Sequence, residues 1–181
     1  STTMPDPKIR EPVFTLTSGP ADAYPAVLRG LSRTIHYDYD PVFQAFYEQV
    51  VEKARTVMRL STPPVILHGE PVLGLEAAAA SLIARGDVVL NLASGVYGKG
   101  FGFWAKRYCA ELVEIEVPYN EAIDPESVAR MLQGRPDIRI VSLCHHDTPS
   151  GTINPVDAIG RIVAEHGAYL IVDAVSSFGG M

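Results

Sequence analysis

Apolar residues recur at helical spacing over residues 41–60, starting at Pro41, a residue favoured at the first position of a helix. Charged residues occupy the opposite face, so this segment is predicted to be a long amphipathic helix. Two prolines follow at residues 63–64. Beyond them, short apolar runs alternate with helical stretches. Strands are predicted at residues 65–68, 87–92, 112–117, 138–145 and 168–173, and helices at residues 71–84, 96–108, 124–133 and 154–167.

Strands that alternate with helices predict an α/β fold, with a mostly parallel sheet sandwiched between helices. The last strand, AYLIVD, is apolar enough to be buried on both faces. We expect a flexible arm at residues 1–12, an N-terminal segment with the long helix at 13–60, and a large α/β domain at 61–181. Ligands of parallel sheets bind at the carboxyl ends of the strands. That rule selects residues 68–70, 93–98, 145–150 and 173–177.

The charge distribution limits the partners that the protein can have. The formal net charge is −6, and the basic residues are scattered, which argues against nucleic-acid or membrane binding. No apolar run approaches the roughly 18 residues that span a bilayer. Cys109 and Cys144 have neither a disulfide framework nor metal-ligand spacing, so a reducing cytoplasm is expected. The polar residues 1–12 do not resemble a signal peptide.

Two segments at strand ends suggest ligand sites at first sight. The glycine-rich GVYGKGFG, residues 95–102, lacks the spacing of either common nucleotide loop, so a permissive turn is favoured. Tyr97 within it is either a ring that lies flat on a planar ligand or an ordinary half-buried tyrosine. His145, His146 and Asp147 look like a metal cluster, but neighbours on a strand point to opposite faces. No metal site is therefore expected.

Three further polar positions have open explanations. Thr148, with Ser150, either supplies hydroxyl donors to a ligand or stabilises a turn. Asp173 ends an apolar strand, where a carboxylate is costly unless a cationic ring nitrogen or the following backbone pairs with it. Glu70 stands at a helix N-terminus, where phosphate often binds. The simpler explanation for Glu70 is a helix cap stabilised by the helix dipole, by about 0.3–1 kcal/mol.

Taken together, these loops resemble those of fold-type I pyridoxal-phosphate enzymes of the class V aminotransferase group. The matching segments are TSGP (residues 17–20), SGVYG (94–98), HHDTPSGTINP (145–155) and VDAVSSFGG (172–180). The resemblance implies that Asp173 keeps a pyridine nitrogen protonated, so that the ring can accept electrons. It also implies that Tyr97 stacks on the ring, that Thr148 lies near its phenolic oxygen, and that the protein forms a homodimer or homotetramer.

One segment departs from the pattern of this group. Where its members carry a small, hydroxyl-bearing phosphate cup, this chain has Glu70-Pro71-Val72-Leu73-Gly74. A phosphate dianion about 4 Å from Glu70 would be repelled by about 1 kcal/mol or more. A neutral hydroxymethyl group can instead donate a hydrogen bond to that carboxylate.

A branch of the group uses free pyridoxamine, and HGEPVLGLEAAAASLI and NLASGVYGKGFG resemble its segments. The resemblance implies an aminotransferase of vitamin B6 degradation that transfers the amino group of free pyridoxamine to pyruvate. The products would be pyridoxal and L-alanine. The vitamin would be substrate and product, so no tightly bound cofactor is expected.

Two alternatives stay open. The first is a conventional enzyme of the group that uses pyridoxal 5'-phosphate, acts on alanine or serine with glyoxylate or pyruvate, and has Glu70 as a helix cap. The second is a non-catalytic fragment or assembly module. The group's Schiff-base lysine lies beyond the strand of Asp173, and neither Lys99 nor Lys106 matches its position. We expect the chain to be the N-terminal portion of a longer enzyme, without the small C-terminal domain and inactive alone.

Overall fold

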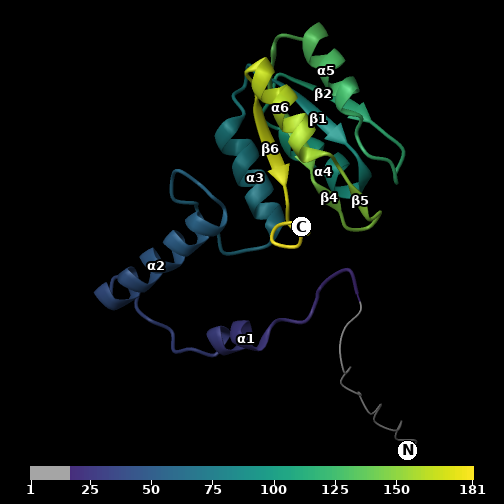
Figure 1. Ribbon diagram of the computed structural model, residues 1–181. Coiled ribbons are helices and arrows are strands. Elements are labelled where there is room, and N and C mark those ends of the chain that lie inside the picture. The colour runs from purple at the N-terminus through teal and green to yellow at the C-terminus, as the bar shows by residue number, and fades with distance from the viewer. Residues whose placement is uncertain (1–16) are drawn as a thin grey trace, which may run out of the picture. The chain divides into compact units, whose positions relative to one another are not determined.

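The structure is a computed structural model that describes residues 17–181 (Figure 1). The arm expected at residues 1–12 lies outside this range. Contacts between Cα atoms divide the chain into two units, with the boundary between Ile66 and Leu67. Within residues 17–181, no helix combines the length and the apolar character that crossing a membrane requires.

The first unit contains the helices α1 (Pro25–Leu31) and α2 (Pro41–Val57). The Asp40 side chain caps α2 by accepting a hydrogen bond from the Val42 amide at 2.8 Å. Pro41 occupies the first helical position, where its missing N–H is no loss. The predicted long helix is confirmed, although it ends a few residues early.

The second unit is built on a parallel sheet of four strands in the order β2-β1-β3-β6. In chain order the strands are β1 (Val88–Ala93), β2 (Glu111–Glu116), β3 (Ile138–Cys144) and β6 (Tyr169–Asp173). The helices are α3 (Pro71–Leu82), α4 (Gly95–Ala105), α5 (Pro125–Gly134) and α6 (Val156–His166). A short antiparallel hairpin of β4 (His146–Asp147) and β5 (Thr152–Ile153) follows β3. The predicted α/β fold is confirmed.

Helices cover both faces of this sheet, as Figure 1 shows. Successive side chains of a strand point to opposite faces, so β1 contributes to two cores. Leu90 packs in one core with Val128 of α5 and Ile159 of α6. Val89 packs in the other core with Phe101 of α4 and residues of α3. All four helices of this unit therefore take part in burying the sheet.

Two predictions about strands are wrong. Residues 65–68 form no strand, and Val65 is 84% exposed. A strand needs a neighbour to pair with its backbone, and this run has none among residues 17–181. The strand β6 does form, but it is not buried on both faces, since Tyr169 is 63% exposed. It lies at the edge of the sheet, so the helices cover it only in part.

The start of α6 also differs from the prediction, although its end at Gly167, in the left-handed conformation, is confirmed. Pro155 is the N-cap residue, and no side chain caps the helix there. The Asn154 side chain is buried and serves a different purpose. It accepts a hydrogen bond from the Ile123 amide and donates one to the Cys144 carbonyl, both at 2.8 Å. Asn154 therefore joins the segment before α5 to the end of β3.

The chain leaves the two central strands in opposite directions. From β1 it passes through α4 to β2, and from β3 it passes through α6 to β6. Ligands of open α/β sheets bind in the crevice where the connections diverge, outside the carboxyl ends of the strands. The fold therefore places the candidate site between the loop after β1 and the loop after β3.

Candidate active site

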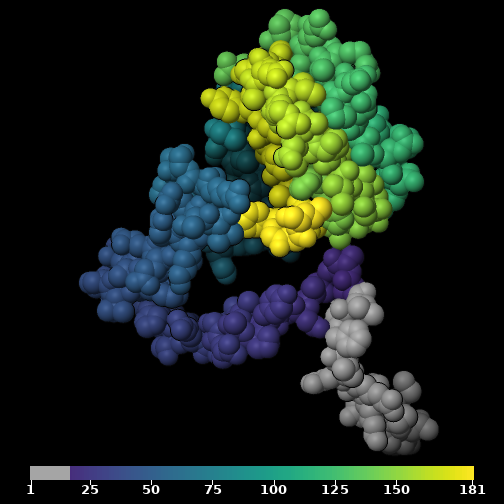
Figure 2. Space-filling model, viewed as in Figure 1, coloured from purple at the N-terminus to yellow at the C-terminus, as the bar shows by residue number. Residues whose placement is uncertain are grey.

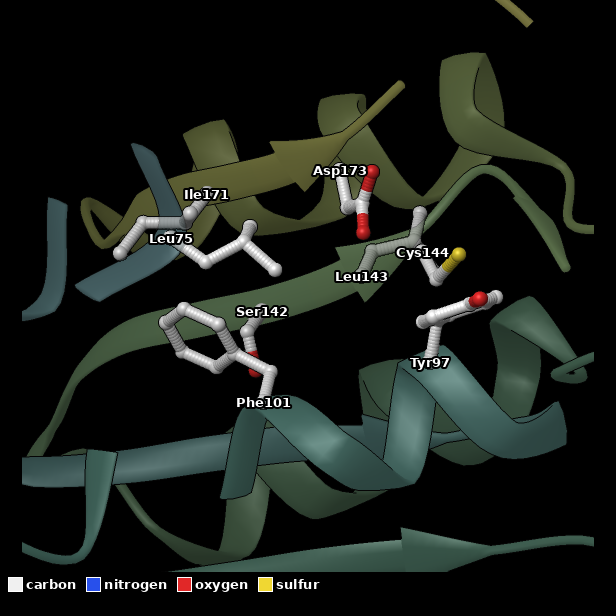
Figure 3. Close-up of a pocket in the computed structure, with 8 residues that line it drawn as sticks. All are labelled: Leu75, Tyr97, Phe101, Ser142, Leu143, Cys144, Ile171 and Asp173. Carbon is white, nitrogen blue, oxygen red and sulfur yellow. The ribbon is translucent and has the colours of Figure 1, made fainter. Parts of the chain in front are cut away.

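A small pocket lies where β3 and β6 end, between these strands and the helices α3 and α4. Its lining consists of Leu75, Tyr97, Phe101, Ser142, Leu143, Cys144, Ile171 and Asp173 (Figure 3). Its volume is about 10 Å³, the space of a single water molecule, so a ring-sized ligand must lie above this floor. Figure 3 shows the Tyr97 ring and the Asp173 carboxylate at one end of the pocket, with Cys144 between them in this view.

Asp173 is half-buried as the last residue of β6. One carboxylate oxygen, Oδ1, accepts a hydrogen bond from the Val175 amide at 3.1 Å. The other oxygen accepts no hydrogen bond from residues 17–181, and Asp173 belongs to the lining of the pocket. The backbone explanation for Asp173 therefore accounts for one oxygen, and the second is available to a donor on a ligand, such as a protonated ring nitrogen.

Tyr97 lies in the first turn of α4 and is 47% exposed. The residue before the helix, Ser94, does not cap it, because its hydroxyl donates to the Glu121 carbonyl at 2.7 Å. The Tyr97 amide donates instead to Asp147 Oδ1 at 2.9 Å. An aromatic ring held at the mouth of a pocket in this way can stack on a planar ligand.

Asp147 and Thr148 lie where β4 turns into β5. Asp147 is fully buried, and its Oδ2 accepts hydrogen bonds from the amide and the hydroxyl of Ser150, at 3.1 and 2.7 Å. Thr148 is half-buried in the turn, and its hydroxyl makes no hydrogen bond to the described part of the chain. Thr148 does not line the pocket, but it directly follows the carboxylate that holds Tyr97.

Glu70 stands at the N-cap position of α3, which begins at the end of the sheet where β6 ends (Figure 1). Its carbonyl accepts a hydrogen bond from Leu73, but its side chain makes no capping hydrogen bond. The cap explanation of this side chain is therefore not supported by a contact. The carboxylate is exposed, without an ion pair within residues 17–181, and the same helix carries Leu75 into the pocket lining.

The two adjacent histidines bind serines rather than one shared partner. His145 Nδ1 lies 2.9 Å from Ser177 Oγ, and His146 Nδ1 lies 2.8 Å from Ser176 Oγ. The Ser176 hydroxyl donates its proton to the His146 carbonyl. In the contact between His146 Nδ1 and Ser176 Oγ, Nδ1 is therefore the donor. These contacts join the segment after β6, the yellow surface in Figure 2, to the region of the hairpin. Across residues 17–181, His, Cys, Asp and Glu form no cluster suited to a metal ion.

The pocket floor contains two groups that the sequence did not single out. Burial raises the pKa of the Cys144 thiol to about 12, and the Asp173 and Asp147 carboxylates contribute to the rise. Ser142 donates to Asn91 Oδ1 at 2.7 Å inside the sheet. The sequence carries no local signal for the contacts of these groups with Asn91 and Asp173, because these two partners lie on strands that are distant along the chain.

Comparison with known proteins gives several matches. Residues 72–181 match the family model described as Aminotransferase class-V. The chain is 74% identical over 175 residues to the pyridoxamine–pyruvate transaminase of Mesorhizobium japonicum, a match that covers 97% of this chain and 44% of that protein. The chain thus spans less than half the length of this curated relative.

Solved structures agree with the sequence match. The pyridoxamine–pyruvate aminotransferase of Mesorhizobium loti superposes with a TM-score of 0.93 at 74% identity, over 97% of this chain and 45% of that chain. The ureidoglycine–glyoxylate aminotransferase of Bacillus subtilis gives a TM-score of 0.85 at 30% identity, over 95% of this chain and 45% of that chain. The family match covers more than half of the chain, and the parallel sheet agrees with the fold of these solved structures. The chain belongs to the class-V aminotransferase family.

Proposed function

We propose that the protein containing this chain transfers the amino group of free pyridoxamine to pyruvate, giving pyridoxal and L-alanine. The observation that carries the proposal is the Glu70 carboxylate, which stands at the start of α3 without a capping hydrogen bond. A carboxylate at this position repels a phosphate and accepts a hydrogen bond from a neutral hydroxymethyl group. The 74% identity to a protein named for pyridoxamine and pyruvate supports the same conclusion.

The residues around the pocket fit an unphosphorylated vitamin B6 ring. Such a ring, when bound, supplies an electron-accepting pyridinium. The uncommitted oxygen of Asp173 accepts the ring N–H and holds that proton in place. Tyr97 covers one face of the ring, and the Thr148 hydroxyl, which has no partner in the described residues, donates toward the phenolic oxygen. Glu70 selects the hydroxymethyl arm.

The amine chemistry itself needs a lysine, and neither candidate in this chain is placed for it. Lys99 forms an ion pair with Glu116, and neither Lys99 nor Lys106 lines the pocket. Since the resemblance to the family puts the reacting lysine beyond the strand of Asp173, the proposal assigns it to a part of the protein outside these 181 residues. The present chain contributes the ring site.

The experiment is an assay of the full-length protein with pyridoxamine and pyruvate, in which pyridoxal is followed by absorbance and alanine by chromatography. Both products should form in equal amounts, without added pyridoxal 5'-phosphate. If pyridoxal is absent while a phosphate-dependent transamination of alanine or serine proceeds, the conventional alternative replaces the proposal. If neither reaction occurs and the intact mass of the natural protein matches this chain, the assembly module is favoured.

We also infer that the vitamin is exchanged as substrate and product, so that the purified protein keeps no yellow chromophore through dialysis. Vitamin B6 chemistry as such follows from the family.

The same proposal includes a homodimer or homotetramer and a cytoplasmic location. Light scattering of the full-length protein measures the former, and fractionation of the source cells measures the latter.

A further inference from the structure

We propose that Asp147 is a positioning residue, which holds the ring-stacking Tyr97 and the turn of Thr148 in one fixed arrangement. The inference deepens the proposed function, because it concerns the same ring site. Asp147 does not line the pocket itself, so it acts through its two neighbours rather than on the ligand.

The hydrogen bonds of Asp147 connect two loops. Its Oδ1 accepts from the Tyr97 amide at 2.9 Å, and its Oδ2 accepts from the amide and the hydroxyl of Ser150. Its backbone carbonyl accepts from the Gly151 amide at 2.8 Å, which closes the turn that contains Thr148. The side chain is fully buried and has no ion pair in the described part of the chain. A buried carboxylate is tolerated because three donors surround it.

The backbone of α4 is shaped to admit this carboxylate. Gly95, the first residue of the helix, has φ of +71°, a conformation that favours glycine. A Cβ atom at Gly95 would lie 2.2 Å from Asp147 Cγ and 2.3 Å from Oδ2. Because Gly95 has no side chain, the Asp147 carboxylate can lie directly against the first turn of α4. Ser94, the usual place for a cap, points to Glu121 instead.

The position of this contact gives it a functional consequence. Tyr97 follows β1 and Asp147 follows β3, so their hydrogen bond bridges the crevice where the chain diverges. Loss of the carboxylate frees the Tyr97 ring and the Thr148 turn together. Asp173 is held separately, by Val175, and keeps its contact with the ring nitrogen. We expect weaker ring binding, with KM for pyridoxamine affected more than kcat.

The test uses Asp147→Asn in the full-length protein, with Asp124→Asn as the matched control. Asp124 caps α5 by accepting from the amides of Glu126 and Ser127, so both variants replace a capping carboxylate with an amide. Binding is measured by the fluorescence of pyridoxamine and separately with pyridoxal 5'-phosphate, and folding by thermal melting. Asp147→Asn should raise Kd about tenfold, the size of one lost ring contact, because its single amide oxygen cannot accept from both the Tyr97 and the Ser150 donors. Asp124→Asn should leave Kd unchanged and Tm almost unchanged, because asparagine caps a helix about as well as aspartate.

A double variant tests whether Asp147 acts through Tyr97. In the background of Tyr97→Ala, Asp147→Asn should raise Kd by clearly less than in the wild-type background, because only its effect through the turn of Thr148 remains. Full additivity of the two effects would overturn the inference, as would an unchanged Kd in a folded Asp147→Asn protein. If that variant does not fold, Ser150→Ala, which removes one hydroxyl donor, should still raise Kd, and an unchanged value would overturn the inference.

The two ligands separate this inference from the proposed function. A wild-type protein that binds only pyridoxal 5'-phosphate would contradict the proposed function, and the Asp147 variants would then be compared with that ligand, whose ring is the same. A wild-type protein that binds neither compound would overturn both.

Discussion

The Ser142 hydroxyl donates to Asn91 Oδ1 at 2.7 Å, so a side-chain hydrogen bond joins β3 to β1 within the buried sheet. Asn91 is fully buried, and its amide donates in turn to Glu114 Oε1 at 2.8 Å. Gly102 of α4 leaves room for both groups, because a Cβ there would lie about 3 Å from Glu114 and Asn91. A series of side-chain hydrogen bonds therefore runs from Ser142 in the pocket lining to Glu114 on the edge strand β2.

Ser142→Ala should lower the free energy of unfolding by about 1–3 kcal/mol, because Asn91 Oδ1 would keep its burial and lose its donor. Urea denaturation of the full-length protein measures the change. Ser127→Ala is the control, since it removes an exposed hydroxyl that donates to the Asp124 carbonyl, and its effect should stay within about 0.5 kcal/mol. Equal stability of Ser142→Ala and wild type would show that Asn91 finds another donor.

Glu70→Gln should reverse the preference between the two forms of the vitamin. The amide keeps the size and an acceptor oxygen but removes the charge, so pyridoxal 5'-phosphate should bind at least about fivefold more tightly. Pyridoxamine should bind more weakly, since its hydroxymethyl group loses a charged acceptor. Titration calorimetry with both ligands gives the ratio of affinities. Glu76→Gln, on the same helix and paired with Arg107, should leave that ratio unchanged.

Asp173→Asn should lower kcat/KM for pyridoxamine by about 30-fold or more, since removal of one partner of a desolvated charge pair costs about 2–5 kcal/mol. The asparagine can still accept from the Val175 amide through its oxygen, so the loop should persist. Absorbance of bound pyridoxamine against pH supplies a second readout. The wild type should keep the ring nitrogen protonated to a higher pH than the variant. Asp157→Asn, at an exposed position in the first turn of α6, is the control.

Cys144 should resist alkylation in the folded protein. Burial raises its pKa to about 12, so only about one thiol in ten thousand is ionised at pH 8. Iodoacetamide should label Cys109, which is only partly buried, well before Cys144. In concentrated urea the two rates should converge. Equal rates in the folded protein would contradict the burial of Cys144.

The same pKa shift has a consequence for stability. The pKa of Cys144 is higher in the folded protein than its ordinary value of 9.0, so the folded state binds this proton more tightly. The resulting stabilisation is complete below pH 9 and is lost as the pH rises toward 12. Urea denaturation at a series of pH values should therefore show a decline above about pH 9, and this part of the decline should be absent from Cys144→Ala.

Most of the fold was predictable because its signals are local. Pro41 stands at the first position of α2, α5 begins directly after Asp124, and Gly167 ends α6 in the left-handed conformation. The errors concern contacts with other parts of the chain. Residues 65–68 are apolar enough for a strand but have no described partner, and Asn154 bonds to Ile123 rather than capping the adjacent helix.

For the site, the order of residues along the chain was enough to bring Tyr97 and Asp173 to the same edge, because parallel strands end together. It left two explanations open for Asp173 and assigned no role to Asp147, although both aspartates stand near the ends of apolar strands. Only the folded chain shows that Asp147 is fully buried among three donors, one of them 50 residues away, whereas Asp173 accepts from a single donor within residues 17–181 and has a second oxygen without one there. The difference is one of surroundings, which depend on how distant segments pack, and no spacing within either loop encodes it.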